Sequence, residues 1–386
     1  MELSRRISAI QPSPTLALNS KANQLKKQGH NILNFAVGEP DYPTPQIIVD
    51  QAIASLKAGR TKYTPAGGGL ELRSAIAHKL KRDNQLNFHP DQIVVGCGAK
   101  EILFHIFLAL INDGDEVILT APCWVSYADQ IKAAGGVPVI VPLPKDKHFS
   151  IDEIERYVSK KTIAIVINSP NNPGGYVFTR DEINELGRYL KTKNWWIVSD
   201  EIYEYMAFDS PHICLLQVFP ELSERFILVN GMSKGFAMTG WRVGYLAGPQ
   251  KVSSIVKSLQ SHSSTCIPGF IEDAAVVALN AGAPLLKADV NKLMARRELA
   301  ISTMDRLGSI KYIRPQGAFY IFIDIRDYLK GGMTSLDYSE FLLERFHLAM
   351  APGEAFGCPG WLRLSYAVSD EILVAGIERL HQALTR

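Results

Sequence analysis

The chain has 386 residues, of which 47% are hydrophobic and 21% are charged, a composition typical of a globular protein with two compact domains. Its 41 basic and 39 acidic residues leave a formal charge of +2, and no basic run is interleaved with aromatic residues, which argues against a nucleic-acid partner. The five cysteines are scattered without a CxxC motif, which argues against a disulfide framework and a zinc site and fits a reducing cytoplasm.

The N-terminal part of the sequence predicts an arm and a lid. It begins with polar residues and lacks the pattern of a secretory signal, and no window approaches the about 18 consecutive apolar residues that span a bilayer. We therefore expect neither a signal nor a membrane span. A helix is predicted over 16–28, and a weakly alternating run over 32–37 stops at the turn residues Gly38-Glu39-Pro40-Asp41. So many turn residues indicate that the backbone approaches another group closely.

Two further helices are predicted over 45–58 and 70–82, on either side of a glycine-rich loop at 63–69. From residue 92 onwards, short apolar runs alternate with helical patterns. The apolar runs predict strands at 93–95, 117–120, 137–141, 163–167, 196–199 and 226–229. The helical patterns cover 101–111, 125–134, 152–158 and 180–190. This alternation predicts a mostly parallel sheet with helices on both faces, whose ligands bind beyond the carboxyl ends of the strands.

The pattern changes after residue 248. Long helices are predicted over 251–279 and 284–307, the second with alternating charges typical of a solvated face. Shorter elements follow: strand-like segments at 312–313, 318–323 and 361–366, and helices near 337–345 and 370–384. We interpret this part as a second, α+β domain. The expected organisation is an N-terminal arm over 1–44 that contributes to the small domain, a large domain over 45–283 and a small domain over 284–386.

The stretch from Asn230 to Gly244, Asn-Gly-Met-Ser-Lys-Gly-Phe-Ala-Met-Thr-Gly-Trp-Arg-Val-Gly, carries the most informative lysine of the chain. Lys234 follows a predicted buried strand and lies among small residues, an unusual position for a lysine. Burial beside another cation lowers the pKa of a lysine and makes it a nucleophile that forms Schiff bases. Arg242 would supply such a cation and also bind a phosphate. A lysine in an exposed loop, with glycines that only form turns, is the alternative.

Three other segments carry polar residues just after predicted strands. Gly98-Ala99-Lys100 would offer free backbone N–H groups at a helix N-terminus, which suits a phosphate, although many such turns contain glycines. Asp200 would pair with a pyridinium nitrogen while Tyr203 meets a ring oxygen; a helix-capping aspartate with a packed tyrosine is the alternative. Asn172, held before a proline, would point into the same crevice or simply form a turn.

Two further side chains suit an aromatic ring and a carboxylate. Trp124 is placed to stack on a ring, with ordinary packing as the alternative. Arg363 lies within the apolar run 361–366, where a buried arginine is costly unless it binds a carboxylate. Its planar group matches the two oxygens of a substrate carboxylate, and a structural ion pair with an aspartate is the alternative. No pattern predicts a metal site.

The order and spacing of these elements resemble the class I aminotransferases of the fold type I pyridoxal-phosphate superfamily. The combination is specific: Asn-Pro at 172–173, Asp-x-x-Tyr at 200–203 and Ser-Lys-x-x-x-x-x-Gly-Trp-Arg at 233–242. The match covers essentially all 386 residues. It is most similar to the bacterial gamma subgroup, which includes aspartate and prephenate aminotransferases, at 38–41, 122–127 and 237–242. The resemblance implies a mostly parallel seven-stranded sheet with helices on both faces and a smaller α+β domain.

The resemblance also implies a role for individual residues around the cofactor pyridoxal 5′-phosphate. Lys234 would be the Schiff-base lysine and the catalytic base. Asp200 would hold the pyridine nitrogen protonated, Tyr203 and Asn172 would bind the ring oxygen, and Trp124 would stack on the ring. The phosphate would be bound by Gly98, Ala99, Lys100, Ser233, Arg242 and Tyr63 of the neighbouring subunit. The substrate would be bound by Gly38, Trp124, Asn172 and Arg363 near its α-carboxylate and by Ser13, Thr15 and Lys100 at its distal carboxylate.

These roles imply a cytoplasmic homodimer with shared active sites that acts on amino acids and 2-oxo acids. We expect ping-pong transfer between aspartate and a 2-oxo acid, with 2-oxoglutarate and glutamate as the partner pair. Prephenate, aromatic or alanine aminotransferases and pyridoxal-phosphate-dependent β-lyases are alternatives, and Phe356, Tyr320 and Ile10 either line the pocket or merely pack. An aminotransferase-like effector module of a transcription regulator is the non-enzymatic alternative, and the sequence shows no winged helix-turn-helix ahead of the fold.

Overall fold

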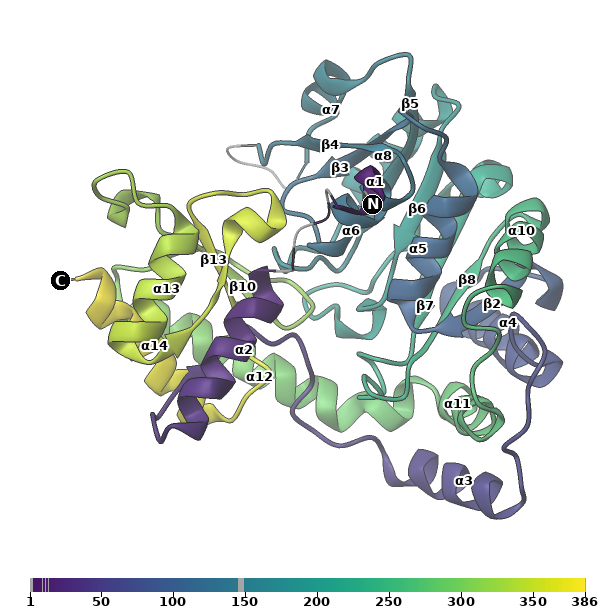
Figure 1. The fold of residues 1–386 in the computed structure, drawn as a ribbon, viewed down its shortest axis with the longest axis horizontal. Helices are drawn as coiled ribbons and strands as arrows, with labels where there is room; N and C mark the ends of the chain where they lie inside the picture. Colours follow the sequence, from purple (N-terminus) through teal and green to yellow (C-terminus); the bar gives the residue numbers. More distant parts are fainter. Residues whose placement is uncertain (1–2, 9, 11, 13, 145–148, 386) are drawn as a thin grey trace.

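The computed structural model describes residues 3–8, 10, 12, 14–144 and 149–385 (Figure 1). Its central sheet has, in spatial order, the strands β2 (Ile93–Cys97), β8 (Val243–Ala247), β7 (Phe226–Gly231), β6 (Trp196–Asp200), β5 (Thr162–Asn168), β3 (Glu116–Thr120) and β4 (Val137–Val141). Only β8 is antiparallel to its neighbours, β2 and β7, within this described sheet. The predicted fold class is therefore confirmed, whereas β8 is not among the predicted strands because its apolar run directly follows the Gly-Trp-Arg turn.

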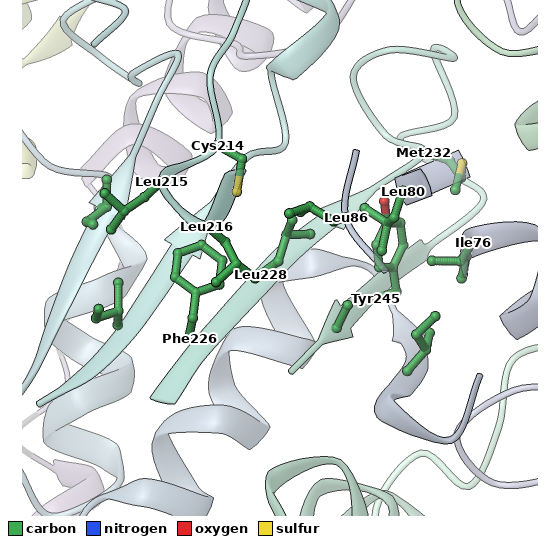
Figure 2. Packing of buried hydrophobic residues seen from close by; sticks show 14 of the residues in the cluster. Ile76, Leu80, Leu86, Cys214, Leu215, Leu216, Phe226, Leu228, Met232 and Tyr245 are labelled. Carbon is green, nitrogen blue, oxygen red and sulfur yellow. The ribbon is translucent and has the colours of Figure 1, made fainter. Parts of the chain in front are cut away.

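Successive side chains of a strand in the central sheet point to opposite faces, and each face has its own hydrophobic core. In β7, Phe226 and Leu228 pack on the first face, shown in Figure 2, whereas Ile227 and Val229 pack on the second. This alternation follows from the two-residue period of a strand. Helices that cover the first face are α3 (Gln46–Lys57), α4 (Leu70–Asn84), α7 (Ile151–Tyr157), α8 (Arg180–Lys191) and α11 (Gly269–Ala281). The second face is covered by α5 (Ala99–Leu110), α6 (Ser126–Ala133) and α10 (Gln250–Ser261).

The C-terminal part contains a smaller antiparallel sheet with its own core. Its strands are β12 (Ala351–Pro352), β13 (Trp361–Ser365), β10 (Tyr320–Asp324) and β9 (Lys311–Ile313), in that spatial order. The helices α12 (Ala283–Leu307), α13 (Ser335–Phe346) and α14 (Asp370–Leu384) pack onto this core, which also includes Leu33, Phe35 and Met206.

The N-terminal segment packs against this C-terminal part although it lies at the other end of the sequence. Strand β1 (Leu33–Asn34) pairs in parallel with β11 (Leu348–Ala349), and α2 (Pro14–Lys27) contacts β11 and β12. In Figure 1, α2, in purple, lies beside the yellow-green C-terminal part. The predicted division at 44/45 and 283/284 stays a prediction. The remaining short elements are α1 (Arg5–Ser8), α9 (Leu215–Val218) and the 3₁₀ turns η1 (Pro90–Gln92), η2 (Glu204–Met206), η3 (Pro220–Arg225), η4 (Arg326–Tyr328) and η5 (Gly353–Phe356).

The expected long helix over 251–279 is wrong, because the structure has α10 and α11 with a break between them. The break contains Thr265 at φ +66° and Pro268, which caps α11. A proline has no N–H for an interior helical hydrogen bond, so α11 can only begin there. In the described part of the chain, no single helix has the length and apolar composition to cross a bilayer. Only α11 and α12 taken together meet both criteria, and their axes are bent by 79° relative to each other.

A buried ionic cluster joins α4, η2 and the end of β7. Lys79 forms an ion pair with Glu204, and their side chains are 1% and 6% exposed. The Lys79 ammonium also donates to Asn84 Oδ1 at 2.7 Å. The amides of Asn84 and Asn230 donate to Glu204 at 2.8 and 2.7 Å. The charges of this cluster are therefore compensated without help from solvent.

Replacing Lys79 by methionine is expected to lower the free energy of unfolding by about 3–5 kcal/mol, because the Glu204 carboxylate would stay buried without its cation. Urea denaturation of the two proteins measures this loss. Arg156→Ala is the matched control, because the Arg156–Glu153 pair is exposed and its removal should cost less than about 1 kcal/mol. Equal small losses for both variants would contradict the prediction.

Candidate active site

One cavity of about 300 Å³, a size that suits a small molecule, lies at the carboxyl ends of β5, β6 and β7. Residues from both ends of the chain border it. Most of the predicted site residues line it: Thr15, Gly38, Ala99, Lys100, Trp124, Asn172, Asp200, Tyr203, Ser233, Lys234, Arg242 and Arg363. Folding therefore gathers these residues at the edge of the parallel sheet where the sequence places a ligand site.

Lys234 lies in the turn after β7, and its ammonium nitrogen donates to the carbonyl oxygen of Gly38 at 2.6 Å. The pKa of Lys234 is lowered to about 8, mainly by burial; the charges of Arg363, Arg242 and Lys100 contribute to this shift, and that of Glu39 opposes it. Nearly all lysines carry their proton at neutral pH, but a substantial part of the Lys234 amine is neutral just above it. The structure thus excludes the exposed-loop alternative for this lysine.

Asp200 is the last residue of β6, and its carboxylate is buried. Burial raises the pKa of Asp200 to about 6, while hydrogen bonds from the Tyr127 hydroxyl, at 2.6 Å, and from the Ile202 N–H, at 3.2 Å, oppose this shift. The hydrogen bond from Ile202 is of the capping kind that the alternative prediction gave to Asp200. Asp200 nevertheless lines the cavity, so the capping contact and a role in ligand binding are compatible.

The amide of Asn168, at the end of β5, connects Asp200 with Asn172. It donates to the Asp200 carbonyl at 2.9 Å and accepts the Asn172 N–H at 2.9 Å. Tyr127 and Asn168 are absent from the predicted site. For Asn168 the sequence does contain a signal, since it ends a predicted strand as Asp200 does, and the two residues pair across β5 and β6.

Arg363 is 4% exposed and forms no ion pair with an acidic side chain of the described chain. Its terminal nitrogens donate to Asn172 Oδ1 at 3.0 Å and to the Ala36 carbonyl at 2.6 Å, and Nε has no partner. Burial lowers the pKa of Arg363. The alternative of a structural arginine–aspartate pair is therefore wrong.

Aromatic rings surround the Arg363 guanidinium. Its central carbon lies 4.5 Å from the ring centre of Tyr320 and 5.0 Å from that of Phe356. The Tyr320 hydroxyl is 2.9 Å from that of Tyr203, to which Asn172 donates at 3.4 Å. Tyr320 thus lines the cavity, whereas Phe356 packs behind the arginine.

The N-terminus of α5 and the Arg242 guanidinium form a cationic corner of the cavity. Gly98, the residue before α5, has φ +86°, and a Cβ there would lie 2.3 Å from an Arg242 nitrogen. Arg242 donates to the carbonyls of Thr239 and Cys97 at 2.8 and 3.1 Å. Lys100 lies 5.0 Å from the ring centre of Trp124, and burial lowers its pKa. Free N–H groups at a helix N-terminus beside cations suit a phosphate.

The family model of class I and II aminotransferases matches residues 30–380 of the chain. The chain belongs to this family. A probable aspartate/prephenate aminotransferase of Aquifex aeolicus is 42% identical, with 99% of this chain and 98% of that protein covered. The aspartate aminotransferase of Bacillus subtilis is 39% identical, with 98% of each covered. The structure of the Thermus thermophilus aspartate aminotransferase with maleate has a TM-score of 0.93 and 37% identity, with 99% of each chain covered.

Aminotransferases of this family depend on pyridoxal 5′-phosphate, and this chain is a transaminase of amino acids and 2-oxo acids. Its cavity has features that fit the cofactor: a buried carboxylate at Asp200 for a ring nitrogen, a lysine of lowered pKa, and a cationic corner for the phosphate. No group of three or more metal-binding side chains occurs among the described residues of this aminotransferase.

Two predicted site residues of the aminotransferase, Gly98 and Tyr63, are not among the residues that line the cavity. Gly98 borders it, as the residue before Ala99, and Tyr63 is 90% exposed outside it. Ser13 lies outside the described residues. Ile10 lines a neighbouring hollow that shares Lys100 and Arg242 with the cavity. Conversely, Leu16 and Asn19 of α2 line the cavity but are not among the predicted site residues. The predicted helix places Asn19 one turn after Thr15 and Leu16, and this spacing is the signal that would have found them.

For the apoprotein, we expect attachment of added pyridoxal 5′-phosphate at Lys234 to become faster with rising pH and to level off above about pH 8. Only the neutral amine attacks an aldehyde, and the pKa of Lys234 is lowered to about 8. The growth of the visible absorbance in buffers of increasing pH measures this rate. A rate that keeps rising to about pH 10, as for an ordinary lysine, would contradict the prediction.

Proposed function

We propose that this aminotransferase transfers the amino group of L-aspartate, with 2-oxoglutarate and glutamate as the second substrate pair, in a ping-pong reaction. The observation that supports it is a set of three cations in one cavity, Lys100, Arg242 and Arg363, without ion pairs to the described acidic side chains. The phosphate of the cofactor would compensate the charge of Arg242. A substrate with two carboxylates would satisfy Arg363 and place a second anion beside Lys100, whereas a monocarboxylic amino acid leaves Lys100 with the phosphate alone.

We assign the side chains around the cofactor as follows. Asp200 holds the ring nitrogen, Tyr203 and Asn172 bind the ring oxygen, and Trp124 stacks on the ring. The phosphate is bound by Gly98, Ala99, Lys100, Ser233 and Arg242. Gly38 and Arg363 bind the substrate α-carboxylate, with Trp124 and Asn172 beside it, and Ser13, Thr15 and Lys100 bind the distal carboxylate. The lowered pKa of Lys234 and the unpaired Nε of Arg363 support these roles.

Bound pyridoxal 5′-phosphate supplies an electron sink for the bond electrons of the substrate Cα. The work of the chain is to orient and to move a proton. Arg363 holds the α-carboxylate and so orients the Cα–H bond. Lys234, once free of the cofactor, takes the proton from Cα as a general base, for which a pKa near the working pH is favourable. Asp200 keeps a negative charge behind the ring, which favours protonation of the ring nitrogen.

A prephenate aminotransferase is the second candidate, because prephenate also carries two carboxylates and the Aquifex aeolicus relative is named for both substrates. The two are separated by the breadth of the side-chain pocket. A steady-state assay with prephenate as amino acceptor and either aspartate or glutamate as donor tests this candidate.

The test of the proposed function uses single amino acids without a co-substrate. Purified holoenzyme is mixed in turn with aspartate, glutamate, alanine, leucine and phenylalanine, and loss of the visible cofactor absorbance is followed. We expect fast loss with the two dicarboxylic amino acids and slow loss with the others. The opposite ranking would overturn the proposal, and steady release of ammonia and pyruvate from a cysteine conjugate would indicate a β-lyase instead.

We also propose a cytoplasmic homodimer in which Tyr63 reaches the cofactor phosphate of the partner subunit. A tyrosine that is 90% exposed in one subunit, beside a glycine-rich loop, supports this assignment. Sedimentation equilibrium of the holoenzyme is expected to give the mass of two chains. A monomer with full activity would contradict both the dimer and the role of Tyr63.

A further inference from the structure

Asn19, in α2, is one of the residues that line the cavity. Thr15, Leu16 and Asn19 all line the cavity, and their spacing of one and four residues places them on one face of the helix. The next residue, Ser20, is exposed, and Leu18 is buried against the C-terminal part. The helix therefore presents one polar amide to the same space that Lys100 and Arg363 enter.

The orientation of this amide follows from a chain of hydrogen bonds. The backbone N–H of Ala36 donates to the side chain of Asn34 at 3.1 Å, so the accepting atom of Asn34 is its oxygen. The Asn34 nitrogen is then the donor to Asn19, at 2.8 Å, and the accepting atom of Asn19 is again an oxygen. With its oxygen engaged in this way, the Asn19 amide is left with its N–H groups as donors for a ligand in the cavity that Asn19 lines.

The same chain of hydrogen bonds extends to Arg363, which also lines the cavity. The carbonyl of Ala36 accepts a hydrogen bond from Arg363 at 2.6 Å, so Ala36 contacts Asn34 through its N–H and Arg363 through its oxygen. The Asn19 amide and the Arg363 guanidinium are thus held in register by one short stretch of backbone. Two groups at a defined separation suit a ligand that carries a polar group at each end.

We infer that Asn19 donates a hydrogen bond to the distal carboxylate of the substrate and is a specificity-determining residue beside Lys100. This inference rests on the proposed preference for dicarboxylic substrates. Lys100 supplies charge, which any anion can use, whereas the oriented amide supplies a directional donor. Asn19 therefore selects for an acceptor at the correct distance from the α-carboxylate.

The test compares two unreactive ligands of the holoenzyme, maleate with two carboxylates and propionate with one. Isothermal titration calorimetry measures their dissociation constants for the wild type, for Asn19→Ala and for Ser20→Ala. We expect Asn19→Ala to weaken maleate about tenfold or more, the usual contribution of a hydrogen bond to a charged group, and to leave propionate unchanged. Ser20→Ala, which changes the same helix on its exposed side, should bind both ligands as the wild type does.

Asn34→Ala tests the orientation, because it leaves Asn19 in place but frees its amide to rotate. We expect a selective loss of maleate affinity that is smaller than the loss in Asn19→Ala; unchanged maleate binding would show that Asn34 does not orient the amide. Equal weakening of both ligands in Asn19→Ala would show a structural role and overturn the inference.

The inference and the proposed function fail in different ways. If wild-type holoenzyme binds maleate no more tightly than propionate, the preference for dicarboxylic substrates is wrong, and the role of Asn19 falls with it. If the wild type prefers maleate and Asn19→Ala keeps the full preference, only the role of Asn19 is wrong.

Discussion

Replacing Lys234 by alanine is expected to abolish transamination, with a loss in kcat of at least about 10⁴-fold. This side chain is assigned both the covalent link to the cofactor and the transfer of the Cα proton. No other lysine among the described residues has an amine that is both beside Asp200 and lowered in pKa to about 8. Lys100, which also lines the cavity, lies over the Trp124 ring at the phosphate corner.

Two measurements separate a lost catalyst from a lost fold. Holoenzyme is reduced with borohydride, which makes the link to the cofactor permanent, and peptide mapping then locates the pyridoxyl group. We expect it at Lys234 in the wild type and nowhere in Lys234→Ala, while circular dichroism of the two proteins is the same. Lys311→Ala, in which an exposed lysine is replaced, is the matched control and should keep full activity. A pyridoxyl label at another position of the wild type would remove Lys234 from the mechanism.

The second large effect is expected for Arg363→Lys, which should lower kcat/KM for aspartate by about 10²- to 10³-fold. The planar guanidinium offers two parallel N–H groups to a carboxylate. The lysine ammonium is a point charge at the end of a shorter side chain and cannot form this paired contact. The loss should appear in KM, because the α-carboxylate is bound in the ground state, and also in kcat, because the same contact orients the Cα–H bond. Half-reaction kinetics at increasing aspartate concentration measure this separation, and unchanged kinetics would count against the role of Arg363.

The surroundings of Arg363 also predict a small effect of its replacement on the free energy of unfolding, in contrast to the large effect expected for a structural ion pair. Its buried cation has no acidic partner among the described residues, so Arg363→Met removes a costly charge. We expect the free energy of unfolding of the apoprotein to fall by no more than about 1 kcal/mol, although activity is lost. Urea denaturation of apoprotein, beside Lys79→Met, measures the difference. A loss as large as that of Lys79→Met would show that the arginine serves the fold rather than the substrate.

Much of the fold follows from local patterns. The strands and helices over 93–199 have strong periodicity, and the structure contains each of them. The prediction missed strand β8, whose apolar run directly follows a glycine-containing turn, and the break between α10 and α11, where the polar run 261–265 and Pro268 interrupt the helical pattern. For β8 the local pattern was ambiguous, and pairing with β2 and β7 selected the strand, whereas Pro268 was a local signal for the break.

The sequence by itself determined which chemical groups are present and that they follow strands: a lysine after β7, an aspartate at the end of β6, and an arginine inside β13. The identity and spacing of those residues were enough to predict the family and its cofactor. Only the tertiary structure decided their surroundings. It shows that Arg363 has no acidic partner within the described residues, that Tyr127 and Asn168 donate hydrogen bonds to Asp200, and that the Asn34 amide donates to Asn19 Oδ1. The reason is physical: burial, pKa and hydrogen-bond direction depend on neighbours brought together from distant segments, and the identity of a residue does not contain them.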